Sequence, residues 1–523
     1  MFAGELLSEC IMPRLNVEEY LNNSEYRVRT NALVENHRAG GFCVFGESPE
    51  AVAFAVGRLQ DIAAIARSST HLAGTALLFS CDCEFGLRMR LKRGGTEFPD
   101  AMAMAKSEDP DLVRRAGRAI AEEMRALGLT WNFAPVADVN SNPKNPIINT
   151  RSFGDDPETV IHYSLPFLEG LQSGGVAGCA KHFPGHGDTS VDSHHELPYI
   201  EGGLGRFQRQ ELPPFQALIT AGVASVMTGH LACPDIAGEL GALHADRGLP
   251  ATLSPVITTS LLRQQLGFDG VIVTDAMEMH AITKLFGEEE ASVRALEAGA
   301  DVLLMPVDPN VAYHALVDAV DAGRITVGQL RDKVARIWRM RQWIEAVGLP
   351  LPANAGLLQA LESHHKDLSR TIARKAIQLT GKVGLDDASL IVIYDDREQA
   401  RDKAKYFASK AMPFFESVTS FTPQEWQASK PSVDDRTIIA TFHRARGYLG
   451  EVATDWTLPR IMASIAEGPQ LGSGVPLGLI LIGSPYLDMD FEVPPQFVLK
   501  TFSESLPSII AALERLFGIP YLE

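Results

Sequence analysis

Several functions are disfavoured by what this chain of 523 residues has little of, beginning with positive charge. Its 47 lysines and arginines are outnumbered by 65 aspartates and glutamates, which gives a net charge of −18. Nucleic acids and anionic membrane surfaces need a basic footprint, so we expect neither as a partner. The sequence has no apolar run of about 18 residues, which predicts no membrane span. Residues 1–10 lack the basic start of a secretory signal peptide.

Cysteine is also scarce, and it is absent from the second half of the chain. Cys81 and Cys83 are two residues apart, but no second cysteine or histidine pair at zinc-site spacing accompanies them. Most of the six cysteines lie in apolar runs, where cysteine behaves as a small hydrophobic residue. This usage predicts a reduced, cytoplasmic protein. We also expect no metal or other cofactor.

Nucleotide-binding motifs are missing too. No GxGxxG fingerprint follows an apolar run, and we find no phosphate-binding loop, HExxH motif, internal repeat or low-complexity segment. The composition, with 46% hydrophobic and 21% charged residues, is that of a globular protein. A chain of this length is expected to form at least two domains.

The first 347 residues contain short apolar runs separated by helical segments. Pro49–Arg67 has Ser48 as its predicted N-cap, Asp111–Leu127 has one apolar face, and Pro255–Leu266 starts with proline after Ser254. Such alternation predicts a parallel (β/α)8 barrel over residues 1–347, with a doubly wound open sheet as the alternative. The eight runs are Glu9–Leu15, Gly41–Phe45, Ala76–Asp82, Leu129–Asp138, Ala177–Phe183, Ala224–Leu231, Gly270–Asp275 and Ala300–Met305.

A second α/β domain is predicted at residues 371–523, after a linker at 348–370 that begins with a segment rich in proline and glycine. Leu361–Leu379 is expected to be a helix. The second domain should contain four strands and a final helix, at Ser389–Tyr394, Thr437–Phe442, Leu477–Ile482, Gln496–Phe502 and Leu506–Phe517.

Residues 181–195 concentrate chemistry-bearing side chains, including four of the 14 histidines. Asp192 and His194 are two residues apart, so in an extended loop they face the same way and the carboxylate can orient the imidazole. His195 is interpreted as a loop histidine satisfied by the backbone. A metal site is the alternative for this cluster, but the spacing fits no zinc motif and Lys181 would repel a cation.

Polar residues also follow other apolar runs, at the strand ends where barrel enzymes carry their sites. Asp82 follows the third run and Asp275 ends the seventh. Asp275 is either a strand-end cap or a nucleophile. These carboxylates, imidazoles and cations suit a ligand with several hydroxyl groups.

Lys181-His-Phe-Pro-Gly-His-Gly-Asp188 with Asp192-Ser-His194 resembles the signature loop of family 3 glycoside hydrolases, in the β-N-acetylglucosaminidase branch. Three other blocks resemble that family in the same order, and the resemblance extends over about residues 30–345. They are Asn132-Phe-Ala-Pro-Val-Ala-Asp138, Arg151-Ser-Phe-Gly154 and Val271-Ile-Val-Thr-Asp-Ala-Met-Glu278.

The resemblance implies a retaining mechanism with Asp275 as nucleophile and His194 as general acid/base, oriented by Asp192. It assigns the hydroxyls of the sugar to four side chains, those of Asp82, Arg151, Lys181 and His182. His186 would shape the glycine loop. The block around Asp82 departs from the family's Asp-x-Glu-Gly-Gly-Arg, because Phe85 replaces a glycine and Arg88 is displaced by one position. Glu84 and Arg88 would then pair with each other.

The function implied is exo-hydrolysis of terminal β-linked N-acetylglucosamine (GlcNAc), in peptidoglycan recycling if the host is a bacterium. A β-glucosidase or β-xylosidase of the same family is an alternative, against which the Asp192/His194 pair argues. A histidine donor also leaves room for phosphorolysis, since no second carboxylate repels phosphate. The remaining alternative is a non-catalytic sugar-binding protein, which we would expect to have lost Asp275 or His194.

Overall fold

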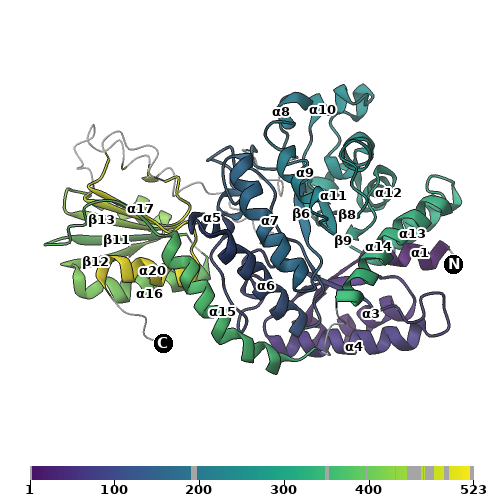
Figure 1. Cartoon of the computed structure of the whole chain (residues 1–523), viewed down its shortest axis with the longest axis horizontal. Coiled ribbons are helices and arrows are strands. Elements are labelled where there is room, and N and C mark those ends of the chain that lie inside the picture. Colours follow the sequence, from purple (N-terminus) through teal and green to yellow (C-terminus); the bar gives the residue numbers. More distant parts are fainter. Residues whose placement is uncertain are drawn as a thin grey trace. The chain divides into compact units, whose positions relative to one another are not determined.

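The computed structural model describes residues 3–189, 197–347, 353–395, 397–429, 431–443, 461–462, 465, 476–487 and 494–518. The chain divides into two compact units, shown with their helices and strands in Figure 1. Unit 1 comprises residues 1–96, 113–145 and 154–365, and unit 2 comprises residues 97–112, 146–153 and 366–523. Each unit is described separately below.

Unit 1 is built on a closed ring of parallel strands. β1 (Ile11–Met12) and β2 (Arg14–Asn16) together form the first predicted strand. β2 pairs with β3 (Gly41–Phe45), β3 with β4 (Leu78–Cys81), and β4 with β5 (Trp131–Asn132). A bridge from Trp131 to Ala177 leads to β6 (Cys179–Phe183), which pairs with β7 (Ser225–Thr228).

The ring then closes on itself. β7 pairs with β8 (Val271–Thr274), and a parallel bridge joins Val273 to Val302, next to β9 (Leu303–Leu304). β9 pairs in parallel with β1. All eight apolar runs therefore supply strands of one barrel, and the alternative of an open doubly wound sheet is wrong because an open sheet has two unpaired edges.

Helices follow the strands around the ring. Ser48 caps α4 (Pro49–Arg67) as predicted, because its side chain accepts a hydrogen bond from the backbone N–H of Ala51. The predicted helix at 255–266 is a π-helix, Val256–Gln265, in which the N–H of Leu266 reaches back to the carbonyl of Leu261. The other main helices of the ring are α3 (Ser24–Glu35), α6 (Pro110–Ala126), α7 (Pro157–Ser173), α9 (Leu212–Thr220), α12 (Glu288–Ala298), α13 (Pro309–Asp321) and α14 (Val327–Val347).

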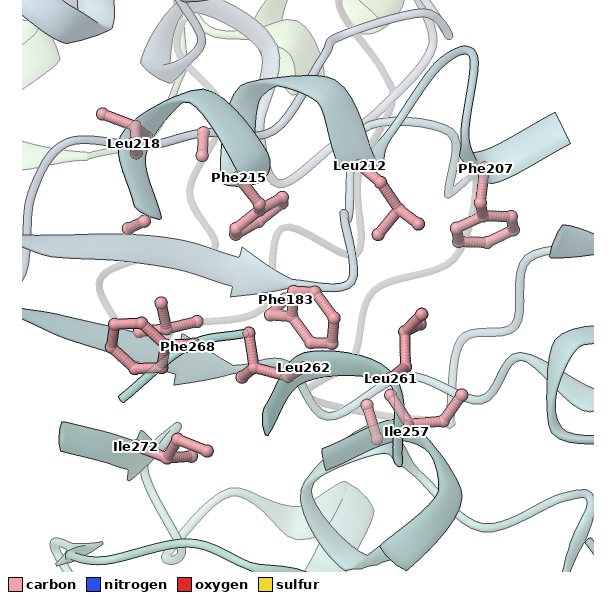
Figure 2. Close-up of a cluster of buried hydrophobic side chains, with 14 of the residues drawn as sticks. Phe183, Phe207, Leu212, Phe215, Leu218, Ile257, Leu261, Leu262, Phe268 and Ile272 are labelled. Atoms are coloured by element: carbon pink, nitrogen blue, oxygen red, sulfur yellow. The ribbon is translucent and has the colours of Figure 1, made fainter. Parts of the chain in front are cut away.

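A core of aromatic and branched side chains fixes the end of β6. Figure 2 shows Phe183 enclosed by side chains of α9 and of the π-helix. The rings of Phe183 and Phe215 meet edge to face with their centroids 5.3 Å apart. Leu212, Leu261 and Phe183 are all at most 3% exposed. This packing holds the strand that carries Lys181 and His182 in a defined position.

Unit 2 contains a six-stranded sheet in the order β10–β15–β14–β13–β11–β12. Only the β10–β15 pair is antiparallel. The predicted strands correspond to β11 (Ser389–Tyr394), β13 (Thr437–His443), β14 (Gly478–Gly483) and β15 (Phe497–Lys500), and the sequence did not reveal β10 (Gln378–Gly381) or β12 (Ser417–Phe421).

The central strands β11, β13 and β14 are buried on both faces, as strands of parallel sheets are. Leu390 and Val392 pack with α16 (Glu398–Ala411) and α20 (Leu506–Phe517) on one face. Ile391 and Ile393 pack on the other face with Trp426 of α17 (Pro423–Ser429). The alternation along one strand therefore divides its side chains between two layers, which gives an α/β sandwich.

The predicted linker at 348–370 differs from what the structure shows. Helix α15 occupies Ala355–Ala376, so most of that range is helical. Proline and glycine are confined to residues 348–356, and this composition marks only the start of the predicted linker. Unit 2 also takes residues 97–112 and 146–153 from the first part of the chain, which no local pattern in the sequence announces.

Candidate active site

The predicted site residues of unit 1 that the structure describes lie at one end of the barrel, because all its strands run in the same direction. Asp82 follows β4, Lys181 and His182 lie in β6, and Asp275 follows β8. Asp138 follows β5, and the C-terminal ends of parallel strands in a barrel form one rim.

Asp82 is the centre of a balanced charge cluster. One carboxylate oxygen accepts from Nζ of Lys181 at 2.8 Å, and the other accepts from Nη2 of Arg90 at 2.5 Å. Lys181 Nζ also lies 2.8 Å from Oε1 of Glu84. Burial alone would raise the pKa of Asp82, but Lys181 and Arg90 hold it well below its usual range. The cluster thus presents fixed charges and donors suited to sugar hydroxyls.

Asp138 organises the backbone and one side chain of the histidine loop. It accepts the backbone N–H of His182 at 3.1 Å and that of His186 at 2.7 Å, and its other oxygen lies 2.7 Å from Nδ1 of His182. Burial acts to raise the pKa of this fully buried carboxyl, and His182 lowers it below its usual value. An ionised Asp138 therefore fixes the Nδ1–H tautomer of His182.

The side chain of His186 does not hydrogen-bond to Asp138 but forms contacts within its own loop. Its Nδ1 lies 2.8 Å from Oγ1 of Thr189, and Asn145 donates to its backbone carbonyl at 2.8 Å. Burial lowers the pKa of His186 to about 4, so the ring is neutral near pH 7. These contacts match the loop-shaping role expected of His186.

Asp275 is held at the end of β8 with its carboxylate only lightly engaged. Oδ1 accepts the backbone N–H of Ala276 at 2.7 Å, and no other hydrogen bond or ion pair of this carboxylate occurs among the described residues. Burial acts to raise its pKa, but His230, His182 and Lys181 together bring it below the ordinary value. The group is therefore ionised at neutral pH, as a nucleophile must be.

His230, which follows β7, supports this arrangement. Nε2 of His230 lies 3.0 Å from the carbonyl of Ala276, which can only accept, so Nε2 carries a proton. Nδ1 lies 2.9 Å from Oγ1 of Thr252. The imidazole thereby braces the backbone that donates to Asp275.

The other predicted site residues lie outside the described part of unit 1. Asp192 and His194 lie outside the described residues, as does His195. Arg151 lies in unit 2, where it is 4% exposed and its Nη1 donates to the carbonyl of Ile147 at 3.0 Å. The roles assigned to Arg151, Asp192 and His194 stay predictions.

The structure corrects the expected pairing of Glu84 with Arg88. Glu84 contacts Lys181, and Arg88 donates to the carbonyl of Leu91 at 3.2 Å. The arginine on Asp82 is Arg90, whose guanidinium also lies over the ring of Phe45. Sequence reasoning missed Arg90 because it searched for the arginine next to its family position.

Asp138 was also missed as a functional residue, although it ends the block Asn132–Asp138 at a predicted strand end. Its signal was the same as that of Asp82 and Asp275, an acidic residue after an apolar run.

In the described part of the chain, no three histidine, cysteine, aspartate or glutamate side chains form a metal-binding group. No described helix is long and apolar enough to cross a membrane.

Comparison with known proteins gives a consistent result. The family model for the "Glycosyl hydrolase family 3 N terminal domain" matches residues 8–340. The "Beta-hexosaminidase A" of Pseudoalteromonas piscicida is 32% identical over 393 residues, which span 70% of this chain and 64% of that protein. The "Beta-N-acetylglucosaminidase/beta-glucosidase" of Cellulomonas fimi is 28% identical over 482 residues, or 87% of this chain and 84% of that protein.

A solved structure covers nearly the whole chain. It is that of a glycoside hydrolase family 3 β-N-acetylglucosaminidase from Paenibacillus sp. str. FPU-7. The TM-score is 0.80 at 28% identity, over 99% of this chain and 97% of that one. Both units of this chain thus have counterparts in one solved chain.

Proposed function

Because the chain belongs to glycosyl hydrolase family 3, we propose that it is a retaining exo-β-N-acetylglucosaminidase. It removes terminal β-linked GlcNAc from a small carbohydrate through a covalent intermediate on Asp275. The observation that carries the proposal is the ionised, lightly engaged Asp275 beside His182, His230 and Lys181. The relatives' names support GlcNAc as the sugar.

The reaction takes two displacements. Asp275 attacks the anomeric carbon, the glycosidic C–O bond breaks, and His194 gives its proton to the leaving oxygen. A water molecule then attacks the same carbon, His194 takes the proton of that water, and Asp275 leaves as carboxylate. Two inversions retain the β configuration. Asp192 stabilises the imidazolium of His194, as a buried carboxylate does in a catalytic triad.

A histidine donor suits this chemistry near neutral pH. The reference pKa of histidine is near 6.5, so one side chain can act first as acid and then as base without strong tuning. The sugar hydroxyls are assigned to Asp82, Lys181 and His182 on the barrel rim, and to Arg151. The Asp82 cluster supports this assignment, since its donors and acceptors are already fixed in place.

The alternative sugar is glucose, because the Cellulomonas fimi relative is named for both activities. The first test uses chromogenic β-glycosides of GlcNAc and of glucose under matched conditions, without added metal. Release from the GlcNAc glycoside alone supports the proposal. Release from the glucose glycoside alone would keep the fold and Asp275 but overturn the role of the Asp192/His194 pair.

We also propose that the enzyme acts in the cytoplasm, on fragments of peptidoglycan. Six cysteines without a disulfide support a reducing compartment. Cell fractionation tests the location, and incubation with GlcNAc-containing wall fragments tests the substrate. Activity found only outside the cell would contradict the cytoplasmic assignment.

A further inference from the structure

Arg206 of α8 (Leu204–Phe207) contacts the chain on both sides of the segment that carries Asp192 and His194. Before that segment, Oδ2 of Asp188 accepts from Nη2 of Arg206 at 2.6 Å. After it, the backbone carbonyl of Glu201 accepts from Nη1 at 2.8 Å. One guanidinium therefore ties residues 188 and 201 to each other.

The surroundings of Arg206 are built to hold it in place. A Cβ atom on Gly202 would lie 2.7 Å from Cδ of Arg206, so the arginine stem fills the space that this glycine leaves. Gly202 has a φ of 104°, which a side chain would strain as well. The backbone N–H of Gly202 donates to Asp235 at 2.8 Å, which fixes this turn to α10 (Pro234–Glu239).

Glu211 is a buried partner that holds the guanidinium of Arg206 in place. Its Oε1 accepts from Nη2 of Arg206 at 2.8 Å, and its side chain is 1% exposed. A Cβ on Gly185 would lie 2.7 Å from Cβ of Glu211, so Glu211 packs directly on the glycine loop that follows His182. Through Glu211, Arg206 is therefore held against the end of β6, the strand that carries Lys181 and His182.

We propose that Arg206 is a positioning residue for the proton donor: by tying Asp188 to Glu201, it fixes both ends of the segment that presents Asp192 and His194. The inference rests on the proposed function, in which His194 protonates the leaving oxygen. Proton transfer needs heavy atoms within hydrogen-bond reach, and a displacement of about 1 Å costs up to about a hundredfold in rate.

Replacing Arg206 should not unfold the protein. Burial raises the pKa of Glu211 to about 7, against the opposing effect of Arg206, so without the cation Glu211 can take up a proton rather than stay as a buried charge. Asp188 and Arg206 are both partly exposed, with 39% and 30% of their side chains accessible. Arg206→Ala and Arg206→Lys remove the two-sided contact to different extents, and Asp188→Asn weakens one side only.

The matched control is Arg209→Ala. Arg209 lies three residues further along, is exposed, and forms no hydrogen bond or ion pair with Asp188 or Glu201. Arg209→Ala removes an arginine from the same region and changes the net charge by the same amount as Arg206→Ala. The four variants are compared with wild type and with His194→Ala.

Each variant is assayed on two GlcNAc glycosides, one with an activated nitrophenol and one with an unactivated alcohol as leaving group. For Arg206→Ala we expect kcat/KM to fall about tenfold to a hundredfold on the alcohol, which needs the proton, and less than about threefold on the phenol. Arg206→Lys and Asp188→Asn should show the same selectivity with smaller losses. Arg209→Ala should match wild type.

Azide provides a second readout that a merely structural residue would not move. It attacks the glycosyl-enzyme without base assistance, so it should accelerate turnover of the phenol glycoside by Arg206→Ala and give the β-glycosyl azide. The inference is overturned if Arg206→Ala loses activity equally on both substrates and azide does not rescue it, provided that His194→Ala loses activity mainly on the alcohol glycoside and is rescued by azide. If His194→Ala itself loses both substrates equally, the proposed proton donor is wrong and the inference falls with it.

Discussion

Both ends of the barrel contain carboxylates near strand ends, and Asp275 at one end is held in a different way from Asp301 and Glu9 at the other. At the rim, Asp275 accepts one hydrogen bond, from a backbone N–H, in the described part of the chain. At the floor, where the strands begin, Asp301 and Glu9 are each enclosed by two arginines. We call these the floor clusters, with Arg263 and Arg336 on Asp301, and Arg67 and Arg341 on Glu9.

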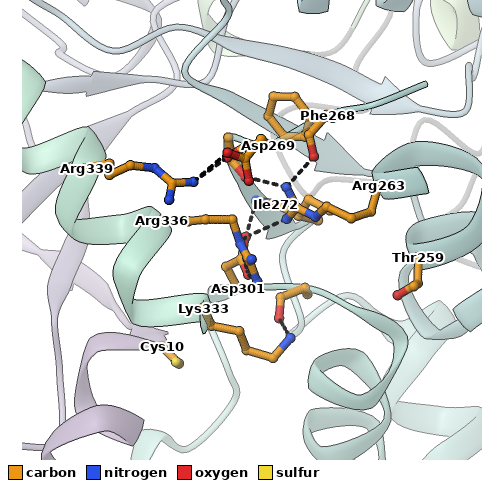
Figure 3. A network of polar contacts seen from close by, with 12 residues as sticks. Cys10, Thr259, Arg263, Phe268, Asp269, Ile272, Asp301, Lys333, Arg336 and Arg339 are labelled. Carbon is orange, nitrogen blue, oxygen red and sulfur yellow. Dashed lines mark hydrogen bonds and ion pairs between the residues drawn. The ribbon is translucent and has the colours of Figure 1, made fainter. Parts of the chain in front are cut away.

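Figure 3 shows the Asp301 cluster. Oδ2 of Asp301 accepts from Nη2 of Arg263 at 2.9 Å and from the backbone N–H of Ile272 at 2.8 Å. Oδ1 accepts from Nη2 of Arg336 at 2.8 Å. Lys333 contacts the adjacent carbonyl of Ala300. A carboxylate saturated in this way has no lone pair to offer a substrate.

The difference teaches how one fold separates stability from chemistry. Both carboxylates lie near strand ends, with Asp275 half-buried and Asp301 fully buried, so a place at a strand end does not by itself identify a nucleophile. What distinguishes Asp275 is incomplete pairing combined with nearby imidazoles that keep it ionised. Five predictions test this contrast, ordered by the size of the expected effect.

The largest effect is expected at the rim. Asp275→Ala removes the nucleophile, so kcat should fall by a factor on the order of 10⁴ or more, with little change in Tm. Azide should then displace the leaving group directly and give the α-glycosyl azide, because one displacement inverts the configuration. A β product, or substantial residual turnover without azide, would remove Asp275 from the mechanism.

At the floor, Asp301→Asn should have the reverse effect. Two arginines lose their buried partner charge, which costs about 3–5 kcal/mol of unfolding free energy. Urea unfolding measures the loss, and the activity per folded molecule should remain close to that of wild type. A stable protein with low activity would mean that the floor also takes part in catalysis.

Arg90 and Arg88 offer a smaller test at the rim. Arg90→Ala removes a charged hydrogen bond from Asp82, so kcat/KM should fall about tenfold to a hundredfold. Arg88→Ala removes only a contact to the carbonyl of Leu91 and should have little effect on kcat/KM. A larger loss of kcat/KM in Arg88→Ala than in Arg90→Ala would mean that Arg88, the arginine near the family position, acts on the substrate instead of Arg90.

Unlike the arginines of the floor clusters, His365 of α15 is a buried cation that titrates, and it pairs with Glu122 and Glu123. Burial lowers its pKa, but Glu122 and Glu123 raise it to about 9, above the ordinary 6.5. A raised folded pKa means that the added stability is complete below about pH 6.5 and is lost as the pH rises through about 9. Relative to His365→Gln, wild type should lose roughly 1–3 kcal/mol between pH 6.5 and 9.5 in urea unfolding. Parallel pH profiles for the two proteins would contradict this.

The smallest effect is expected from thiol reagents. All six cysteines are buried, and burial raises the pKa of Cys10 and Cys179 to about 12. Cys81 lies beside the rim residue Asp82, but its pKa is also well above the usual value, so thiolate is scarce. Treating the folded enzyme with a disulfide reagent should leave its activity unchanged. Rapid loss of activity would indicate an accessible thiol near Asp82.

The barrel was predictable because its signals are local. Eight apolar runs and their capped helices each specify one element, and parallel strands joined by helices place acidic residues such as Asp82 and Asp275 at one rim. The β12 strand was missed because only Val418 and Phe421 are partly buried there and the other residues are exposed, so an edge strand leaves a weak apolar pattern.

By itself, the sequence determined the order of the barrel strands, the chemistry available at each strand end and the resemblance to a family of glycosidases. Only the tertiary structure decided which charges meet. It put Arg90 rather than Arg88 on Asp82, Asp138 on His182, and Arg206 between Asp188 and Glu201. The physical reason is range: strand and helix formation depends on neighbours in sequence, whereas an ion pair depends on where separate segments bring two side chains within about 3 Å.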